Sequence, residues 1–194
     1  CEKKCRRQFV DEPISIAGLK AFASDMDMAS NDKYVPYVEP DTGKRVAIVG
    51  GGPGGLTAAY FLRRLGHSVN VFDMMPKMGG MLRYGIPEYR LPKKLLDREI
   101  SQIEALGVNL KNNVRLGRDI QLEELRHDFD AVVVAAGAWK SSSMRIPGEE
   151  LNGVFGGIDF LREVSLGNAP VIGKTVAVIG GGNTAMDACR TAVR

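Results

Sequence analysis

Short apolar runs alternate with longer segments of helical spacing along most of this chain. The runs at 45–50 and 129–135 are nearly continuous in apolar residues, which is typical of parallel strands covered on both faces. Between 92 and 106, apolar side chains recur every three or four positions after Pro92, which predicts an amphipathic helix. Strands and helices that alternate in this way favour an α/β fold with a parallel sheet.

The same patterns predict the remaining elements. Residues 31–43, with Pro36, Pro40 and Gly43, predict an extended linker. We expect helices over 13–27, 54–65, 92–106, 121–126 and 158–166 and after residue 182, and strands over 45–50, 68–73, 108–111, 113–116, 129–135 and about 174–180.

One segment of the chain occurs twice. The residues from Lys44 to Leu56 are repeated, with substitutions, from Lys174 to Met186, at a constant offset of 130 positions. In each copy an apolar strand leads into a glycine-rich turn and then into a helix of small residues, which is the dinucleotide fingerprint. Its key positions are Gly50, Gly52 and Gly55 in the first copy and Gly180, Gly182 and Ala185 in the second.

Each position of the fingerprint has a physical role. The first glycine permits the tight turn, the second lacks the Cβ that would block a pyrophosphate, and the third small residue lets helix and strand pack closely. The helix N-terminus adds unpaired N–H groups and a partial positive charge. Two such turns predict two nucleotide cofactors.

An acidic residue follows the first copy. Strand 68–73 ends in Asp73, about 20 residues past the glycines, where an acidic side chain takes ribose hydroxyls. The alternative is a structural turn followed by an unrelated surface aspartate. In the second copy the sequence stops at Arg194, within the helix, so NADPH and NADH are not distinguished.

A longer motif carries a family resemblance. Residues 78–93, M-G-G-M-L-R-Y-G-I-P-E-Y-R-L-P-K, resemble the signature of the glutamate synthase small (beta) subunit family, with its NAD(P)H:ferredoxin oxidoreductase and dihydropyrimidine dehydrogenase relatives. The resemblance covers essentially the whole chain, through C-E-K-K-C at 1–5, D-E-P-I-S-I-A-G-L-K at 11–20, A-V-V-V-A-A-G at 131–137, I-P-G-E at 146–149 and N-T-A-M-D at 183–187.

The resemblance implies a division of the chain into parts. It implies a Rossmann-like FAD-binding domain, a preceding helical iron–sulfur segment and the start of a second Rossmann domain for NADPH or NADH. A later Gly-Asp segment completes the flavin site in the family, so we expect this chain to be a piece of a longer polypeptide or complex. The parts are 1–43 (iron–sulfur-type segment and linker), 44–140 (first part of the FAD domain), 141–172 (connector) and 173–194 (truncated NAD(P) domain).

The resemblance also implies roles for individual residues. Gly79 and Gly80 would let the backbone approach the flavin, and Arg83 would place a charge near its ring or pyrophosphate. Alternatively, Arg83 and Arg90 pair with Glu88 and Asp97 on the surface, which we prefer for Arg90. The full cofactor-binding set is Gly50, Gly52, Pro53, Gly54, Gly55, Asp73, Gly79, Gly80, Arg83, Val114, Ala136, Gly137, Gly180, Gly182, Asn183, Thr184 and Ala185.

The acidic residue and the turn after strand 129–135 each have a further feature. Asp73 stands where the family more often has glutamate, which shortens the reach to the ribose by one methylene. Ala136 and Gly137 are assigned to the FAD side, and the alternative is a simple tight turn after a core strand.

The cysteines limit the iron–sulfur interpretation. Cys1 and Cys5 are metal-ligand candidates with C-x-x-x-C spacing, but a four-iron cluster needs about four protein ligands. They are therefore candidates only in a longer polypeptide, and in this chain we expect free thiols or an adventitious disulfide. Cys189 is expected to be a small packing residue.

Composition excludes several classes of protein. With 44% hydrophobic and 25% charged residues among 194, the chain is ordinary for a globular protein. A net charge of +3 does not suggest nucleic-acid binding, and no apolar stretch approaches the ~18 residues of a membrane span. Because no signal peptide opens the chain, we expect a cytoplasmic location. His67 and His127 are expected to be surface or capping residues.

Together these features predict an electron-transfer flavoprotein oxidoreductase subunit. NAD(P)H would reduce FAD, and electrons would pass through iron–sulfur centres to a redox partner such as the glutamate synthase large subunit or ferredoxin. One alternative is a FAD-binding or docking fragment without turnover of its own. Another is a single-cofactor NAD-binding dehydrogenase, against which the second glycine motif argues.

Overall fold

The computed structural model describes residues 2–32 and 34–194 and divides the chain into two compact units, Cys1–Tyr37 and Val38–Arg194. The first division therefore falls after Tyr37, and the four-part division expected from the sequence stays a prediction. Each unit is described by itself.

The first unit is helical. It contains two short 3-10 helices, η1 (Glu2–Lys4) and η2 (Arg6–Phe9), and the α-helix α1 (Ile16–Ala29). The helix expected over 13–27 is confirmed, but it begins three residues later, at Ile16 after the N-cap Ser15, so Pro13 precedes the helix. None of the residues of α1 is buried. The described residues of 31–43 form no helix or strand, as expected for a linker.

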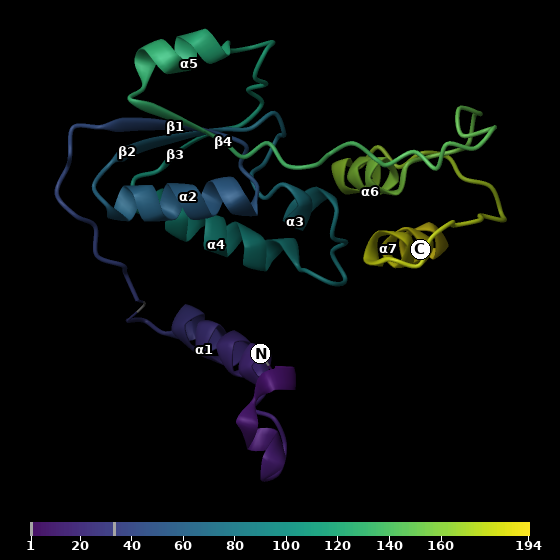
Figure 1. Ribbon diagram of the computed structural model, residues 1–194, viewed down its shortest axis with the longest axis horizontal. Coiled ribbons are helices and arrows are strands. Elements are labelled where there is room, and N and C mark those ends of the chain that lie inside the picture. Colours follow the sequence, from purple (N-terminus) through teal and green to yellow (C-terminus); the bar gives the residue numbers. More distant parts are fainter. Residues whose placement is uncertain (1, 33) are drawn as a thin grey trace. The chain divides into compact units, whose positions relative to one another are not determined.

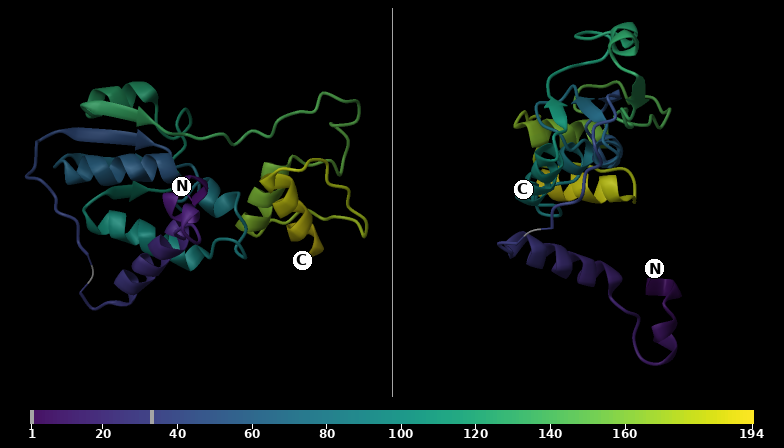
Figure 2. Two further views of the ribbon diagram at one scale, coloured as in Figure 1. Left: turned by 60° about the horizontal axis from the view of Figure 1, so that its bottom comes forward. Right: turned by 90° about the vertical axis from the view of Figure 1, so that its left-hand side faces the viewer.

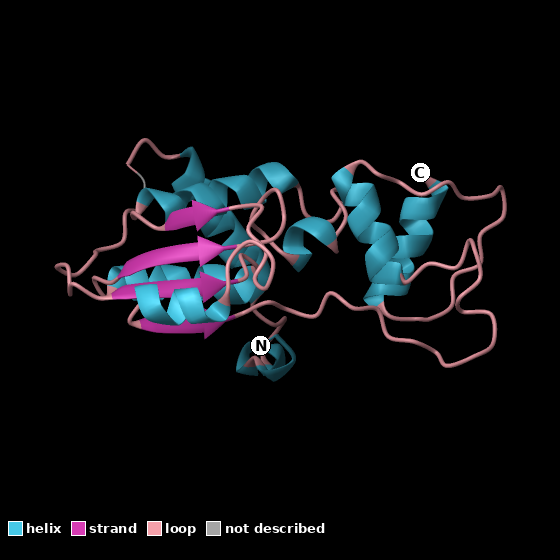
Figure 3. Ribbon diagram, turned by 90° about the horizontal axis from the view of Figure 1, so that it is seen from above, coloured by secondary structure: helices cyan, strands magenta, loops and turns pink. Residues whose placement is uncertain are grey.

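The second unit contains a parallel four-stranded sheet. The strand order is β3-β2-β1-β4, and Figure 3 shows the four strands running in the same direction. The central strand β1 pairs with β2 at Val46↔Val69 and with β4 at Val46↔Ala131. The elements are β1 (Arg45–Val49), α2 (Pro53–Arg64), β2 (Ser68–Phe72), α3 (Met81–Tyr84), α4 (Lys93–Ala105), β3 (Asn109–Lys111), α5 (Leu122–Asp128), β4 (Ala131–Val134), α6 (Gly157–Leu166) and α7 (Asn183–Val193).

Helices cover both faces of the sheet, as the continuous apolar runs indicated. Figure 1 shows α5 on one face and α2 and α4 on the other. Because side chains alternate along β1, Val46 and Ile48 pack with Leu56 of α2 and Leu96 of α4, whereas Ala47 and Val49 pack with Leu125 of α5. The parallel α/β fold expected from the sequence is confirmed.

The connector and the second glycine motif form a helical pair. Helices α6 and α7 lie side by side, as Figure 2 shows, and bury Phe160, Leu161 and Ala188 between them. The helix expected over 158–166 is confirmed as α6.

Two expected strands are not present. Residues 113–116 contribute only an isolated bridge, Leu116↔Ile120, because Asn113 takes a positive φ of 59° that breaks the extended backbone. Residues 174–180 form no strand either, and Val176, Val178 and Ile179 are exposed. No described strand pairs with 174–180, and a strand needs neighbours to satisfy its backbone. The pattern also gave no indication of the short helix α3.

None of the helices in the described part of the chain is both long and apolar enough to cross a membrane.

The core packing predicts how two leucines of α5 differ. Leu125 is fully buried, whereas Leu122 on the same helix is 38% exposed. Leu125→Ala is expected to lower the free energy of unfolding by about 2–5 kcal/mol, since it removes buried methyl groups and leaves a cavity. Leu122→Ala, the matched control, is expected to cost about 1 kcal/mol or less. Urea unfolding measures both, and equal losses would contradict this packing.

Candidate functional site

The first glycine turn connects β1 to α2. Gly50 has a φ of 110°, and a Cβ there would overlap the carbonyl oxygen of Ala135, which follows β4. A Cβ on Gly55 would overlap the carbonyl oxygen of Gly50. Glycine is therefore required at position 50 by conformation and at position 55 by close packing of the helix on the turn, as the sequence predicted.

Gly52 presents a different environment. It is the N-cap of α2, with extended φ and ψ of −79° and −175° and no side-chain cap. A Cβ on Gly52 would have one neighbour within 4 Å, the Cα of Gly80 at 3.7 Å, and a Cβ on Gly54 would have none. Pro53 occupies the first helical position, and the first turn carries no acidic residue. The start of α2 is thus open and suited to an anion.

Asp73 is buried and holds this turn. The residue is 6% exposed, and its Oδ2 accepts a hydrogen bond from the Gly51 N–H at 2.6 Å. Its Oδ1 accepts another from the Met75 N–H at 2.7 Å. The alternative of an unrelated surface aspartate is therefore wrong, because the carboxylate bonds to the glycine turn itself. Its role toward a ribose stays a prediction.

The glycines of the 78–93 motif pack against the same turn. The Gly79 N–H donates to the Gly51 carbonyl at 2.8 Å. Gly80 has a φ of 52°, and a Cβ there would lie 2.7 Å from the Cα of Gly52. Two backbone segments about 30 residues apart thus meet with no side chain between them. The first glycine turn is thus one wall of the candidate site, and the 78–93 motif is the second wall.

Arg83 has one of the alternative partners expected from the sequence, whereas Arg90 has a different one. Arg83 is 7% exposed and donates to the Met78 carbonyl at 2.6 Å. It also pairs with Asp97, which confirms the alternative partner, although Arg83 is buried and not on the surface. Arg90 pairs with Asp187 of α7 at 2.8 Å, so the expected pairing with Glu88 or Asp97 is wrong. Sequence spacing could not predict this contact, because the two residues are 97 positions apart.

Polar side chains around α3 fix the shape of the motif. The Tyr84 hydroxyl bonds to both the N–H and the carbonyl of Lys77 at 3.0 Å, and burial raises the pKa of this hydroxyl. The Lys93 ammonium donates to the carbonyls of Leu82 and Ile86, and burial lowers its pKa, which Glu88 opposes and Arg83 reinforces. These bonds tie α3 to the start of α4.

The other residues predicted for the first site lie at the same end of the sheet. The Val114 N–H donates to the Asp73 carbonyl at 2.9 Å. Ala136 and Gly137 are exposed and directly follow Ala135, which contacts Gly50. The structure therefore brings the two walls, Asp73, Val114 and the turn after β4 together at the carboxyl ends of the strands, where open α/β sheets bind ligands.

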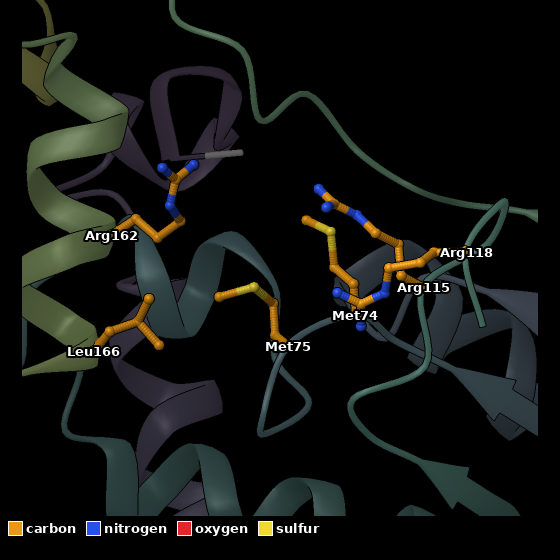
Figure 4. Close-up of a pocket in the computed structure, with 6 residues that line it drawn as sticks. All are labelled: Met74, Met75, Arg115, Arg118, Arg162 and Leu166. Atoms are coloured by element: carbon orange, nitrogen blue, oxygen red, sulfur yellow. The ribbon is translucent and has the colours of Figure 1, made fainter.

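Sequence reasoning missed an arginine-lined cleft at Met74 and Met75, the two residues that follow Asp73. Its volume is about 300 Å³, and Figure 4 shows the methionine side chains between arginines from two sides. Arg118 also pairs with Asp119, and Arg162 with Asp159 and Glu163. The lining residues are Met74, Met75, Arg115, Arg118, Arg162 and Leu166.

The second glycine turn repeats the backbone of the first. Gly180 has a φ of 131°, and Gly182 is the N-cap of α7 with φ and ψ of −81° and 173°. Asn183 begins α7 directly after this glycine, as Pro53 begins α2. A Cβ on Gly182 would meet no atom within 4 Å, and one on Gly180 would lie 3.3 Å from the Cβ of Ala185. Asn183 and Thr184 are exposed.

The cysteine and histidine predictions have separate outcomes. Cys1 lies outside the described residues, and Cys5 is a half-buried free thiol, so their role as metal ligands stays a prediction. Within residues 2–32 and 34–194, no group of three or more His, Cys, Asp or Glu could hold a metal ion. His127 is exposed, as expected, and the half-buried His67 bonds to the Thr42 hydroxyl at 2.7 Å.

Comparison with protein families and curated proteins gives consistent matches. Residues 44–194 match the family model described as pyridine nucleotide-disulphide oxidoreductase. The whole chain is 42% identical to NADP(+)-dependent formate dehydrogenase subunit beta of Moorella thermoacetica, covering 31% of its length. It is 45% identical to NADPH-Fe(3+) oxidoreductase subunit beta of Geobacter sulfurreducens, covering 30%, and 39% identical to the glutamate synthase [NADPH] small chain of Mycobacterium tuberculosis, covering 42%. The chain thus spans less than half the length of these relatives.

Solved structures show the same fold. FprA from Mycobacterium tuberculosis in complex with NADPH matches with a TM-score of 0.57 and 30% identity, over 64% of this chain and 29% of that chain. A 2-naphthoyl-CoA reductase complex matches with a TM-score of 0.65 and 23% identity, over 82% of this chain and 23% of that chain.

The glycine geometry predicts how two adjacent substitutions differ. Gly55→Ala is expected to lower the free energy of unfolding by about 1–3 kcal/mol, because the added methyl group overlaps the Gly50 carbonyl. Gly54→Ala, one position earlier in the same helical turn, meets open space and is expected to change stability by about 0.5 kcal/mol or to raise it slightly. Denaturant unfolding of both variants measures the difference, and a neutral Gly55→Ala would contradict the close packing.

Proposed function

The chain belongs to the pyridine nucleotide-disulphide oxidoreductase family, and from this we propose that it is the FAD-binding part of a subunit that passes electrons from NAD(P)H to FAD and onward. The onward acceptors are iron–sulfur centres of a longer polypeptide and a redox partner subunit. The observation that carries the proposal is the pair of matched turns, since one chain has two helix starts with the same backbone and an open second glycine.

The first turn fits a flavin dinucleotide. The space that a Cβ on Gly52 would fill is free except for the Gly80 backbone, so a pyrophosphate can approach the start of α2. Gly79, Gly80 and Arg83 on one side and Ala136 and Gly137 on the other would enclose the flavin. Asp73 and Val114 would lie toward the adenosine end of the dinucleotide.

The second turn fits a nicotinamide dinucleotide. Gly180, Gly182, Asn183, Thr184 and Ala185 would hold its pyrophosphate at the start of α7. When bound, the two cofactors would supply the redox chemistry, NAD(P)H as the hydride donor and FAD as the acceptor. This chain's residues bind and orient both groups.

The names of the relatives support a partner for the electrons. Two are beta subunits and one is a small chain, and they carry formate dehydrogenase, NADPH-Fe(3+) oxidoreductase and glutamate synthase names. We therefore infer that this protein works with a redox partner subunit. We also propose a cytoplasmic location. Cys1 and Cys5 would be iron–sulfur ligands in the longer polypeptide.

One observation favours a second candidate function. The segment 174–180 is exposed and forms no strand among the described residues, so the nicotinamide site lacks its supporting sheet here. A FAD-binding or docking module without turnover of its own would also have this structure.

Matched substitutions in the two turns test the proposal. Gly52→Val is expected to abolish flavin retention, because the side chain fills the space for the pyrophosphate. Gly182→Val is expected to retain flavin at the wild-type level but to weaken nicotinamide binding, so that NAD(P)H bleaches the flavin at least ten-fold more slowly. Visible absorbance of the holoenzyme measures both effects, with circular dichroism as the control for folding.

The outcomes separate the two candidate functions. Full flavin in folded Gly52→Val would refute the assignment of the first turn. A wild-type protein that retains FAD but is bleached by neither NADPH nor NADH would favour the docking module.

A further inference from the structure

A loop of the 78–93 motif holds the helix of the second glycine turn. The Arg90 guanidinium pairs with the Asp187 carboxylate of α7 at 2.8 Å, and the Tyr89 hydroxyl lies 3.4 Å from the same carboxylate. Asp187 is 4% exposed, whereas the Arg90 side chain is 42% exposed. A partly exposed arginine therefore pairs with a buried carboxylate 97 positions away in the sequence.

The end of α7 also contacts the ring of Tyr89. The guanidinium groups of Arg190 and Arg194 lie 4.9 and 4.2 Å from the ring centroid. Asp187 and Arg190 are three residues apart and share one face of α7, and Arg194 is the C-cap of this helix. Tyr89 and Arg90 together, which we call the latch, thus hold α7 through an ion pair and two cation–π contacts.

Each end of the latch is connected to one glycine turn. Gly80, which packs on Gly52, is the N-cap of α3, and Lys93 bonds to the carbonyls of Leu82 and Ile86 after it. On the other side, Asp187 lies in the second turn of α7, which begins directly after Gly182. A displacement of the latch therefore displaces the second glycine turn relative to the first.

An ion pair with one buried partner, Asp187, is weak evidence for a stabilising role, because the cost of desolvating the carboxylate offsets the attraction. Such a pair can instead select one arrangement of the parts that carry it. Apolar packing between α6 and α7, by contrast, is non-directional. The geometry of the pair suits a role in alignment.

We propose that Arg90 and Asp187 are positioning residues that align the second nucleotide turn with the first and so set the rate of hydride transfer. The inference rests on the proposed function, with FAD at the first turn and NAD(P)H at the second. A misplacement of about 1 Å between reacting groups can slow a reaction by about 10²-fold. The latch acts through α7 and the 78–93 motif.

The test compares Arg90→Ala, Asp187→Asn and the double variant in the flavin-loaded holoenzyme. Arg126→Ala, on the exposed surface of α5, is the control. We expect each single variant to keep its flavin content and to bind nicotinamide within about three-fold, but to be reduced at least ten-fold more slowly at saturating NAD(P)H. The double variant should be no slower than the slower single variant, since both changes break one interaction. Arg90→Lys should recover part of the rate.

Two further readouts do not depend on turnover. A nicotinamide stacked on a flavin gives long-wavelength charge-transfer absorbance, which should fall in Arg90→Ala and Asp187→Asn but not in Arg126→Ala. Amide hydrogen exchange in α7 should become faster in the same two variants, because the helix is less firmly held.

The results distinguish failure of the latch from failure of the proposed function. Unchanged reduction rates, or loss of flavin in both single variants, would overturn the positioning role. If the wild-type holoenzyme binds FAD but is not reduced by NAD(P)H, the proposed function fails instead. Amide hydrogen exchange in α7 then tests the latch by itself. Unchanged exchange in Arg90→Ala and Asp187→Asn would overturn the positioning role.

Discussion

The second unit depends on the close approach of backbone segments at the first glycine turn. Three parts of the chain meet there without intervening side chains: the turn after β1, the start of the 78–93 motif and the turn after β4. The buried carboxylate of Asp73 supplements this packing by accepting hydrogen bonds from two backbone N–H groups. Because these contacts are short and directional, they fix the end of the sheet where the cofactor residues gather.

The first βαβ unit could be predicted from the sequence because its determinants are local. The apolar runs specify strands with both faces covered, and the glycines specify a turn that other residues cannot adopt. The strand at 174–180 has the same local pattern but is not formed, since strands also need neighbours that supply hydrogen bonds. The turn at Gly180 forms even so. The glycines therefore determine the conformation of the turn without the strand pairing of a sheet.

The side-chain partners at the site were less predictable. Arg83 pairs within its own region, at a spacing that the sequence allowed, whereas Arg90 reaches a helix nearly one hundred positions away. The cleft has the same origin, because Arg162 comes from the connector helix α6 and Arg115 and Arg118 from the loop before α5. Apolar periodicity identifies which face of an element is buried, but it does not identify which charged residues of distant elements meet at that face.

The strand order has a consequence for the order of events during folding. The β1–β2 pairing joins residues only 23 positions apart, as at Val46↔Val69, whereas β1–β4 pairing joins Val46 to Ala131 across 85 positions. Closing the longer loop loses more chain entropy, so the sheet is expected to grow outward from its first βαβ unit, with β4 joining later. Because the turn after β4 packs against Gly50, the glycine turn would acquire its last wall only in that late step, and a flavin added earlier would meet an incomplete pocket.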